Sequence, residues 1–202
     1  FFDYLKLRSS YGEVGNAEIG TYPWQGLYGF NPAYDGMPGS NPTQVANNQL
    51  TWESQGAFNV GLDWAIMDSR VTGTVEYYKK TSTDLLLDVP VSLTTGFEST
   101  LQNFGDMENS GIEISVHADL LRTSDYDLAV DFNITTQDNE ITRLQEPILD
   151  GTKRREVGRD YQEYYLYGWA GVDPTNGDPL WYTDETKSQT TNSLSQAERF
   201  YD

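Results

Sequence analysis

Residues 57–78 read AFNVGLDWAIMDSRVTGTVEYY, and this stretch decides the fold. Apolar and polar side chains alternate on both sides of a short polar break at residues 67–70. Such alternation predicts a β-hairpin with one apolar face and one polar face. Each arm is longer than an ordinary strand of about five or six residues, and about ten alternating residues cross a bilayer in a tilted barrel. The apolar row consists of Phe58, Val60, Leu62, Trp64, Ile66, Val71, Val75 and Tyr77.

The same pattern recurs at residues 112–134, and a further alternating segment at residues 4–14 precedes both hairpins. Short breaks lie at 67–70 and 122–125, whereas long connections occupy 15–51, 84–108 and 137–160. If consecutive strands run up and down, the short turns fall at one end and the long loops at the other, as in outer-membrane barrels. We therefore predict an all-β fold, an antiparallel up-and-down meander of long strands without helices. A β-sandwich in water would alternate in the same way, so it stays an alternative.

Composition excludes several classes of function. The chain has 202 residues, with 31 acidic and 13 basic side chains and a formal net charge of −18. This charge argues against binding to nucleic acid or docking on anionic lipid. Without cysteine and with one histidine, His117, we expect neither a metal site nor a cofactor. No nucleophile or acid–base motif is recognisable, so we do not expect an enzyme. No run of about 18 apolar residues exists that would form a transmembrane helix.

Five segments resemble, in order, successive blocks of the SusC/RagA-type TonB-dependent outer-membrane transporters of Bacteroidetes. They are LKLRSSYGEVGN (5–16), LTWESQGAFNVGLDW (50–64), RVTGTVEYYKKTSTDLLLDVPVSLTTGF (70–97), NFGDMENSGIEISV (103–116) and YGWAGVDPTNGDPLWY (167–182). The resemblance implies a transmembrane β-barrel of about 22 strands with long extracellular loops. Residues 1–182 would be a middle fragment of that barrel, and residues 183–202 a polar tail that is loop or poorly ordered.

The resemblance also implies partners and a location. The protein would lie in the outer membrane, in contact with its lipid, and would import oligosaccharides or peptides. A SusD-like surface lipoprotein would cap the barrel. A plug and a TonB-contacting segment would belong to parts of the protein outside this chain.

Aromatic residues in the longest connection are the candidate ligand contacts. Trp24, Tyr28 and Tyr34 lie among Pro and Gly residues, on the side that the resemblance makes extracellular. Flat rings suit sugar faces or apolar peptide side chains. The same rings could instead pack the loop on itself or on the lipoprotein.

The two rows of the hairpins have different expected environments. If the barrel prediction holds, Val60, Leu62 and Trp64 face lipid, and a polar row faces the lumen. That polar row is Asp63, Glu76, Glu113, His117, Asp119 and Asp131. Trp64, Tyr77 and Tyr126 lie near the expected strand ends, where an interfacial girdle and ordinary packing are equally good interpretations. Residues 173–178 resemble a calcium loop, but Gly177 occupies its fifth position, which favours a tight turn.

Two functions follow from these patterns. The first is a barrel segment of a TonB-dependent nutrient transporter, which makes and breaks no bond. The second is a soluble, secreted β-sandwich that binds carbohydrate through its loop aromatics. Because the chain begins in strand-like alternation and ends without a recognisable terminal element, we expect it to be a piece of a larger protein.

Overall fold

A computed structural model describes residues 2–16, 19–30 and 33–201. The chain divides into two compact units, residues 1–145 and residues 146–202, which are treated separately below. In the described ranges, no helix has the length and apolar character that crossing a bilayer requires. The helical segments present are two short 3₁₀ turns, η1 (Leu93–Thr95) and η2 (Leu194–Gln196).

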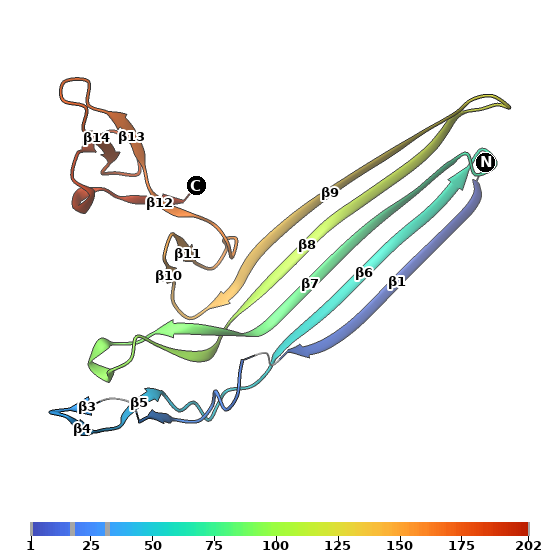
Figure 1. Ribbon diagram of the computed structural model, residues 1–202. Helices are drawn as coiled ribbons and strands as arrows, with labels where there is room; N and C mark the ends of the chain where they lie inside the picture. Colours follow the sequence, from blue (N-terminus) through green and yellow to red (C-terminus); the bar gives the residue numbers. More distant parts are fainter. Residues whose placement is uncertain (1, 17–18, 31–32, 202) are drawn as a thin grey trace. The chain divides into compact units, whose positions relative to one another are not determined.

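The first unit is built on one sheet of five long antiparallel strands in the order β1-β6-β7-β8-β9 (Figure 1). The strands are β1 (Phe2–Asn16), β6 (Glu53–Ile66), β7 (Val71–Pro90), β8 (Ser99–Arg122) and β9 (Asp127–Leu144). Each long strand pairs with the next long strand along the chain, so the predicted up-and-down meander is confirmed. Strand lengths of 14 to 24 residues exceed the bilayer-spanning minimum of about ten.

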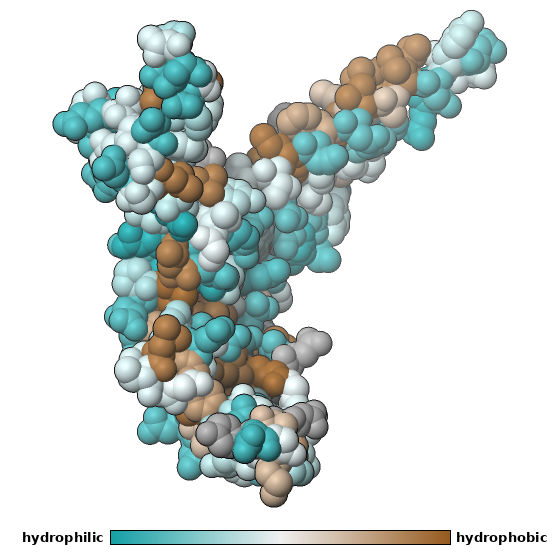
Figure 2. Space-filling model, turned by 60° about the vertical axis from the view of Figure 1, so that its left-hand side comes forward, coloured by the Kyte–Doolittle hydropathy of each residue, from teal (hydrophilic) through white to brown (hydrophobic). Residues whose placement is uncertain are grey.

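The register places the apolar row of every strand on one face of the sheet. Residues directly opposite one another share a face, and one such row runs Leu7, Leu62, Val75, Ile114, Ile134 across all five strands. The adjacent row, Lys6, Asp63, Thr74, Ser115, Asn133, lies on the other face. In Figure 2 the strand arm at the upper right carries brown side chains along one side and teal side chains along the other. The predicted two-faced hairpins are therefore confirmed.

The apolar face is uncovered. On the edge strands Leu7 is 74% exposed and Phe132 is 56% exposed, and on the inner strands Leu62 and Val75 are still 36% and 39% exposed. A β-sandwich would bury such side chains between two sheets. The sandwich alternative is therefore wrong for this sheet. The exposed apolar band is what a barrel wall presents to lipid.

The two ends of the sheet differ as the sequence predicts. At one end, β6 and β7 are joined by Met67, Asp68 and Ser69, all in the left-handed region (φ 58°, 54° and 59°), followed by Arg70. The Ser69 N–H donates to Asp3 Oδ2 at 3.0 Å, which ties this turn to β1. A second short turn, residues 123–126, joins β8 to β9. The connections from β1 to β6 and from β7 to β8 lie at the opposite end (Figure 1).

Two of the predicted long connections are wrong in extent. Most of residues 84–108 is strand, since β7 continues to Pro90 and β8 begins at Ser99, leaving residues 91–98 as the connection. Likewise β9 continues to Leu144, inside the predicted loop 137–160. The alternation ends earlier because register shifts between Ser82 and Leu86 interrupt it. Outside the apolar band, moreover, neither side of a strand has to be apolar. Apolar and polar residues therefore need not alternate there, even though the segment is a strand.

The predicted loop 15–51 contains a nested pair of small hairpins. Strand β2 (Leu27–Gly29) pairs with β5 (Asn41–Gln44), and β3 (Ala33–Tyr34) pairs with β4 (Met37–Pro38). The Gln44 side-chain amide donates to the carbonyls of Tyr22, Pro23 and Gln25 at 2.8–3.0 Å. The two N–H groups of this amide, shared among three carbonyl acceptors, fix the bend before β2, so this proline-rich segment has a defined backbone in its described parts.

The second unit consists of short paired strands. They are β10 (Ile148–Asp150), β11 (Lys153–Arg155), β12 (Tyr165–Tyr167), β13 (Trp169–Val172), β14 (Pro179–Tyr182), β15 (Thr190–Thr191) and β16 (Arg199–Tyr201). The predicted tight turn at residues 173–178 is confirmed, because Asp173 N–H donates to the Asp178 carbonyl at 2.8 Å between β13 and β14. Residues 183–202 were expected to be loop or poorly ordered, but β15, η2 and β16 lie in them. Pairing of β16 with β12, 32 residues or more away in sequence, explains this difference.

Candidate functional site

The polar face of the five-stranded sheet is the first candidate surface. Arg8 on β1 crosses it, with Nε 3.2 Å from Asp63 Oδ1 and Nη2 2.6 Å from Glu76 Oε2. It can reach β7 because Gly61 stands opposite it on β6, and a Cβ there would lie 2.8 Å from Arg8 Cζ. One guanidinium group therefore joins three strands. On the opposite face, in the same row as Val75 and Tyr77, Lys79 Nζ lies 2.7 Å from Glu108 Oε1.

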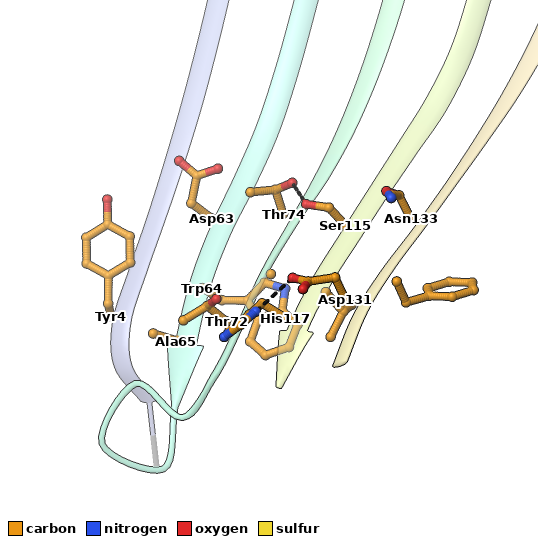
Figure 3. Close-up of a pocket in the computed structure, with 13 residues that line it drawn as sticks. Tyr4, Asp63, Trp64, Ala65, Thr72, Thr74, Ser115, His117, Asp131 and Asn133 are labelled. Atoms are coloured by element: carbon orange, nitrogen blue, oxygen red, sulfur yellow. Dashed lines mark hydrogen bonds and ion pairs between the residues drawn. The ribbon is translucent and has the colours of Figure 1, made fainter. Parts of the chain in front are cut away.

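Toward the short-turn end, polar groups pair between neighbouring strands (Figure 3). Thr74 and Ser115 share a hydroxyl hydrogen bond of 2.7 Å, and His117 Nδ1 lies 2.7 Å from Asp131 Oδ1. The other ring nitrogen, Nε2, lies 3.4 Å from Asp119 Oδ1. The residues predicted for a lumen-facing row therefore do share this polar face, and most of the carboxylates are paired with a cation.

A second polar cluster lies where β7 bends, above the apolar band. Asp84 has a left-handed backbone (φ 57°) at the register shift of β7, and its N–H donates to Asp106 Oδ1 at 3.0 Å. Arg143 on β9 bonds Asp106 through Nε and Nη2 at 2.6 and 2.8 Å, and Asp84 Oδ1 through Nη2 at 3.1 Å. We call Asp84, Asp106 and Arg143 the bend cluster. It connects three adjacent strands and fixes the direction in which the β7–β8 hairpin leaves the sheet.

Asparagine side chains tie the long loop to the same hairpin. Asn103 Nδ2 donates to the carbonyls of Thr51 and Asp84 at 2.9 and 2.8 Å, while its Oδ1 accepts from Thr51 N–H at 2.9 Å. Asn47 Nδ2 donates to the Leu101 carbonyl at 3.0 Å. These contacts hold the β5–β6 connection against β8. The sequence analysis did not single out these residues, although Thr51, Asn103 and Asp106 lie within the quoted segments 50–64 and 103–116.

Two hollows open beside these ties. The larger, of about 530 Å³, is lined by Pro23, Leu86, Phe97 and Leu101 among others. The smaller, of about 410 Å³, is lined mainly by amide side chains. Val45 and Thr100 line both hollows, so the two adjoin one another. Both lie at the long-loop end of the first unit.

Trp24 and Tyr28, two of the predicted ligand-contact residues, line neither hollow, although Pro23 beside Trp24 lines the larger one. Trp24 is 47% exposed and Tyr28, in β2, is 62% exposed, so both rings are available for contact. The backbone of Tyr34 is in β3, but its side chain lies outside the described residues. Ligand contact by these three residues stays a prediction.

The second unit is held together by arginine–tyrosine contacts. Arg155 Cζ lies 4.3 Å from the centroid of the Tyr161 ring, and Arg159 Cζ lies 4.1 Å from that of Tyr201. Burial, together with the hydrogen bond from its hydroxyl to Glu156, raises the pKa of Tyr201 to about 12. Hydrogen bonds from the Thr186 hydroxyl and from nearby backbone N–H groups lower the pKa of Asp184 to about 2. Tyr201 and Asp184 therefore each form hydrogen bonds that stabilise the structure around them.

Within the described ranges, no group of three or more His, Cys, Asp or Glu side chains is placed to hold a metal ion. In the turn that resembles a calcium loop, Asp173 Oδ1 instead accepts from the N–H and hydroxyl of Thr175 at 2.8 and 2.6 Å. The Asp173 carboxylate therefore accepts hydrogen bonds within its own turn.

Comparison with known proteins gives one consistent family. A family model described as "TonB dependent receptor-like, beta-barrel" matches residues 1–200. The chain is 35% identical over 174 residues to TonB-dependent receptor P39 of Formosa agariphila, covering 85% of this chain and 17% of that protein. It is 30% identical over 205 residues to TonB-dependent receptor SusC of Bacteroides thetaiotaomicron, covering 98% of this chain and 18% of that protein.

A solved structure titled "Structure of the RagAB peptide transporter" superposes with a TM-score of 0.82 at 31% identity, over 98% of this chain and 23% of that chain. A second, the RagAB peptide importer in its "open-open" state, gives a TM-score of 0.82 at 30% identity with the same coverage. The chain thus spans less than a fifth of the length of the curated relatives that it matches. The family match also extends through most of residues 183–202, beyond the last segment quoted above.

Proposed function

This chain belongs to the TonB-dependent receptor β-barrel family of the outer membrane, and within it to the SusC/RagA type; from that membership we propose that it forms part of the wall and extracellular loops of a nutrient importer. Its relatives are transporters and receptors rather than enzymes. The observation that carries the proposal is the five-strand register, which is free of shifts from Val71 to Ser82 of β7 and their partners and keeps the apolar rows of that part on one face. The apolar face would contact lipid, and the face with Arg8 and His117 would line the lumen.

We further propose the direction of the strands. Outer-membrane barrels have short periplasmic turns and long extracellular loops. On that basis the turns at residues 67–70 and 123–126 would be periplasmic. The nested hairpins β2–β5 and the tip of the β7–β8 hairpin would then face the cell exterior, where cargo arrives.

Cargo and partners are proposed from the relatives. The RagAB structures are described as a peptide transporter and importer, and SusC is named as a TonB-dependent receptor. Supported by these likenesses, we propose uptake of oligosaccharides or peptides together with a SusD-like surface lipoprotein and with energy from TonB. Exposed rings such as those of Trp24 and Tyr28 would contact either the cargo or the lipoprotein. Residues 1–182 would all belong to the barrel and its loops.

Uptake by intact cells tests this function. Deleting the gene of the intact receptor should abolish energy-dependent uptake of its cargo, drawn from labelled oligosaccharides and peptides, and a plasmid copy should restore it. Uptake of every candidate at the wild-type rate in the deletion strain would refute the proposal.

Cysteine labelling tests the orientation separately. The chain has no cysteine, so a single one can be placed without background from this segment. We expect a membrane-impermeant maleimide to label Glu98→Cys, beside the β7–β8 tip, on intact cells. Ser124→Cys, in the short turn, should react only after the outer membrane is opened. The reverse pattern would contradict the proposed direction.

A further inference from the structure

The apolar face of the five-stranded sheet ends, toward the long loops, along a line that runs obliquely across the strands. On each strand the next residue of that face beyond the line is polar or, on β6, glycine. The last apolar or aromatic residues, taken from β1 to β9, are Tyr11, Phe58, Tyr77, Ile112 and Ile134. We call these five residues the edge line.

The register shows how steep the edge line is. Paired residues lie in one row perpendicular to the strands, and Ile134 of β9 shares such a row with Leu7 of β1. On β1, however, the edge lies at Tyr11. The line therefore climbs about 13 Å along the strands, at about 3.3 Å per residue, while it crosses from β1 to β9 over about 19 Å, at about 4.8 Å per strand. Its slope is about 35°, which matches the strand tilt of about 35–45° in outer-membrane barrels.

This slope points to a bilayer as the partner of the face. A bilayer surface is a plane, and a plane that cuts tilted strands leaves an oblique trace on the sheet. A second protein would follow its own surface and has no reason to end at the angle of strand tilt. The height agrees as well: the strand path from Ile66 to Gly56 is about 33 Å, which spans about 26 Å of the membrane normal at that tilt, close to an apolar band of about 25 Å.

Two polar tips reach from the edge toward the long loops. The Tyr11 ring is 72% exposed, and its hydroxyl lies 3.4 Å from the Cβ position of Gly56, one step farther out on β6. This hydroxyl forms no hydrogen bond with another residue that the structure describes. Lys79 points the same way, because its Nζ lies 2.7 Å from Glu108, which pairs with Thr81 and not with Lys79. Tyrosine and lysine take this posture at a membrane surface, with the apolar part in the band and the polar tip outside it.

Polar groups on either side of the line differ in how they are satisfied. Ser9 lies below the line on β1, and its hydroxyl donates to the Asn59 carbonyl at 3.2 Å. A hydroxyl that is paired in this way can lie in hydrocarbon without a water partner. Near the edge, the carboxylates of this face lie beyond the line, and they are Glu13, Glu108, Asp138 and Glu140.

We propose that the outer-leaflet surface of the membrane meets this wall along the edge line, where the Tyr11 hydroxyl and the Lys79 ammonium contact ester and phosphate oxygens of the lipids. Residues 81–90 of β7 and 99–108 of β8 then stand outside the bilayer. The leaflet rests on the proposed function, since the long-loop end must face the exterior. The position and slope of the line rest on the register.

Depth-dependent quenching tests the line. Single cysteines at Ser9 and Thr136, in an intact receptor freed of other cysteines, carry bimane. The vesicles are phosphatidylcholine with a nitroxide either on the headgroup or near the end of an acyl chain. Ser9 and Thr136 share one row of the outer face but lie on opposite sides of the edge line, so each is the matched control of the other. We expect Ser9→Cys to lie about 11 Å deeper than Thr136→Cys, from the strand spacing and a tilt of about 35°.

Ser110→Cys tests the headgroup contact, because Ser110 pairs with Lys79 across the strands. The headgroup nitroxide should quench it more than the acyl nitroxide does, and the opposite order would refute the contact at Lys79. Equal depths of Ser9→Cys and Thr136→Cys would overturn the oblique line. Bimane at Ser9 that neither nitroxide quenches would also overturn the proposal, because a second copy or another protein would then cover the face.

Labelling on intact cells separates this inference from the proposed strand direction. A membrane-impermeant maleimide should reach Asp138→Cys, which lies beyond the line on β9. If the two depths differ as expected but Asp138→Cys reacts only after the outer membrane is opened, the line stands and the proposed direction is wrong. If the depths are equal while Glu98→Cys and Ser124→Cys react as proposed above, the direction stands and this inference fails.

Discussion

Gly111 is the position at which a single methyl group should do the most damage to the barrel wall. It lies on β8 opposite Tyr78 of β7 and Gln137 of β9. A Cβ built there would be 2.2 Å from the Thr136 carbonyl oxygen and 2.7 Å from the Tyr78 ring. The ring could swing aside, but the carbonyl is part of the backbone of the neighbouring strand. Gly111→Ala therefore forces β8 and β9 apart.

The size of the effect follows from this geometry. Since van der Waals contact begins at about 3.5 Å, β9 must move away by about 1 Å next to Gly111. Overpacking of this kind costs about 1–3 kcal/mol, and the displaced Tyr78 ring loses its contact with the bare backbone of Gly111 in addition. We expect Gly111→Ala to lower the stability of the assembled receptor by at least this amount.

Gly12→Ala is the matched control, because nothing lies within 4 Å of the Cβ position at Gly12 on β1. Alanine has no rotamers to lose and restricts the unfolded chain, so this change should be neutral or slightly stabilising. The assay is urea unfolding of the intact receptor in detergent, followed by the change in gel mobility of the folded barrel. If Gly111→Ala and Gly12→Ala unfold at the same urea concentration, the reasoning from strand spacing is refuted.

Four further predictions concern the faces, the bend and the second unit. Val75→Arg puts a charge on the apolar face and should lower the stability of the barrel by about 2–4 kcal/mol if it lies near the bilayer centre. Thr74→Arg, on the polar face, should still assemble. Equal yields of the two variants in outer membranes would contradict the assigned faces. Arg143→Gln should speed hydrogen exchange over residues 85–104, because the bend cluster loses its cation, whereas Arg122→Gln, whose exposed ion pair with Asp119 is 3.7 Å long, should not. Because the folded pKa of Tyr201 is raised to about 12, its contribution to stability should be complete below pH 10 and lost as the pH rises through 12. Ultraviolet titration of tyrosinate, with Tyr201→Phe as the reference, checks this; a Tyr201 that ionises near pH 10 would be inconsistent with it. The folded pKa of Asp184 is lowered to about 2, so its stabilising effect should persist above pH 4 and disappear as the pH falls toward 2, which hydrogen exchange over residues 184–189 would report.

The sequence predicts the middle of the strands well and their outer parts poorly, for a physical reason. Between Phe58 and Ile66 one face of the strand is apolar and the other carries polar groups, so apolar and polar residues alternate with the pleat. From Asp84 onward the strand leaves the apolar band, and the triple leucine 85–87 and the bulge at Asp84 hide its periodicity. The strand is still present because β8 continues to pair with it.

The polar clusters depend on partners that are distant in sequence. Arg143 and Asp106 are 37 residues apart, and Asn103 and Thr51 are 52 apart, so only the register shows that they meet. Single polar residues in a long strand carry no signal of which neighbour they will face. Residues 199–201 illustrate the same limit: a segment of three residues, too short to show a periodicity, becomes β16 because Tyr165 and Leu166 lie opposite Tyr201 and Phe200. By contrast, Trp24 is noticeable in the sequence alone as a ring in a Pro/Gly-rich connection, and the structure leaves it 47% exposed, while its contact with a ligand stays a prediction.

Arg8 has a consequence for how the barrel is assembled. Its guanidinium crosses Gly61 to reach both Asp63 and Glu76, so its two ion pairs form only when β1, β6 and β7 are aligned in one register. A slip of β1 by one residue would turn Arg8 into the bilayer and leave two carboxylates without their cation. Backbone hydrogen bonds alone would form both in the observed register and after a slip of one residue. The two ion pairs of Arg8 thus favour the observed alignment of β1, β6 and β7 over a one-residue slip.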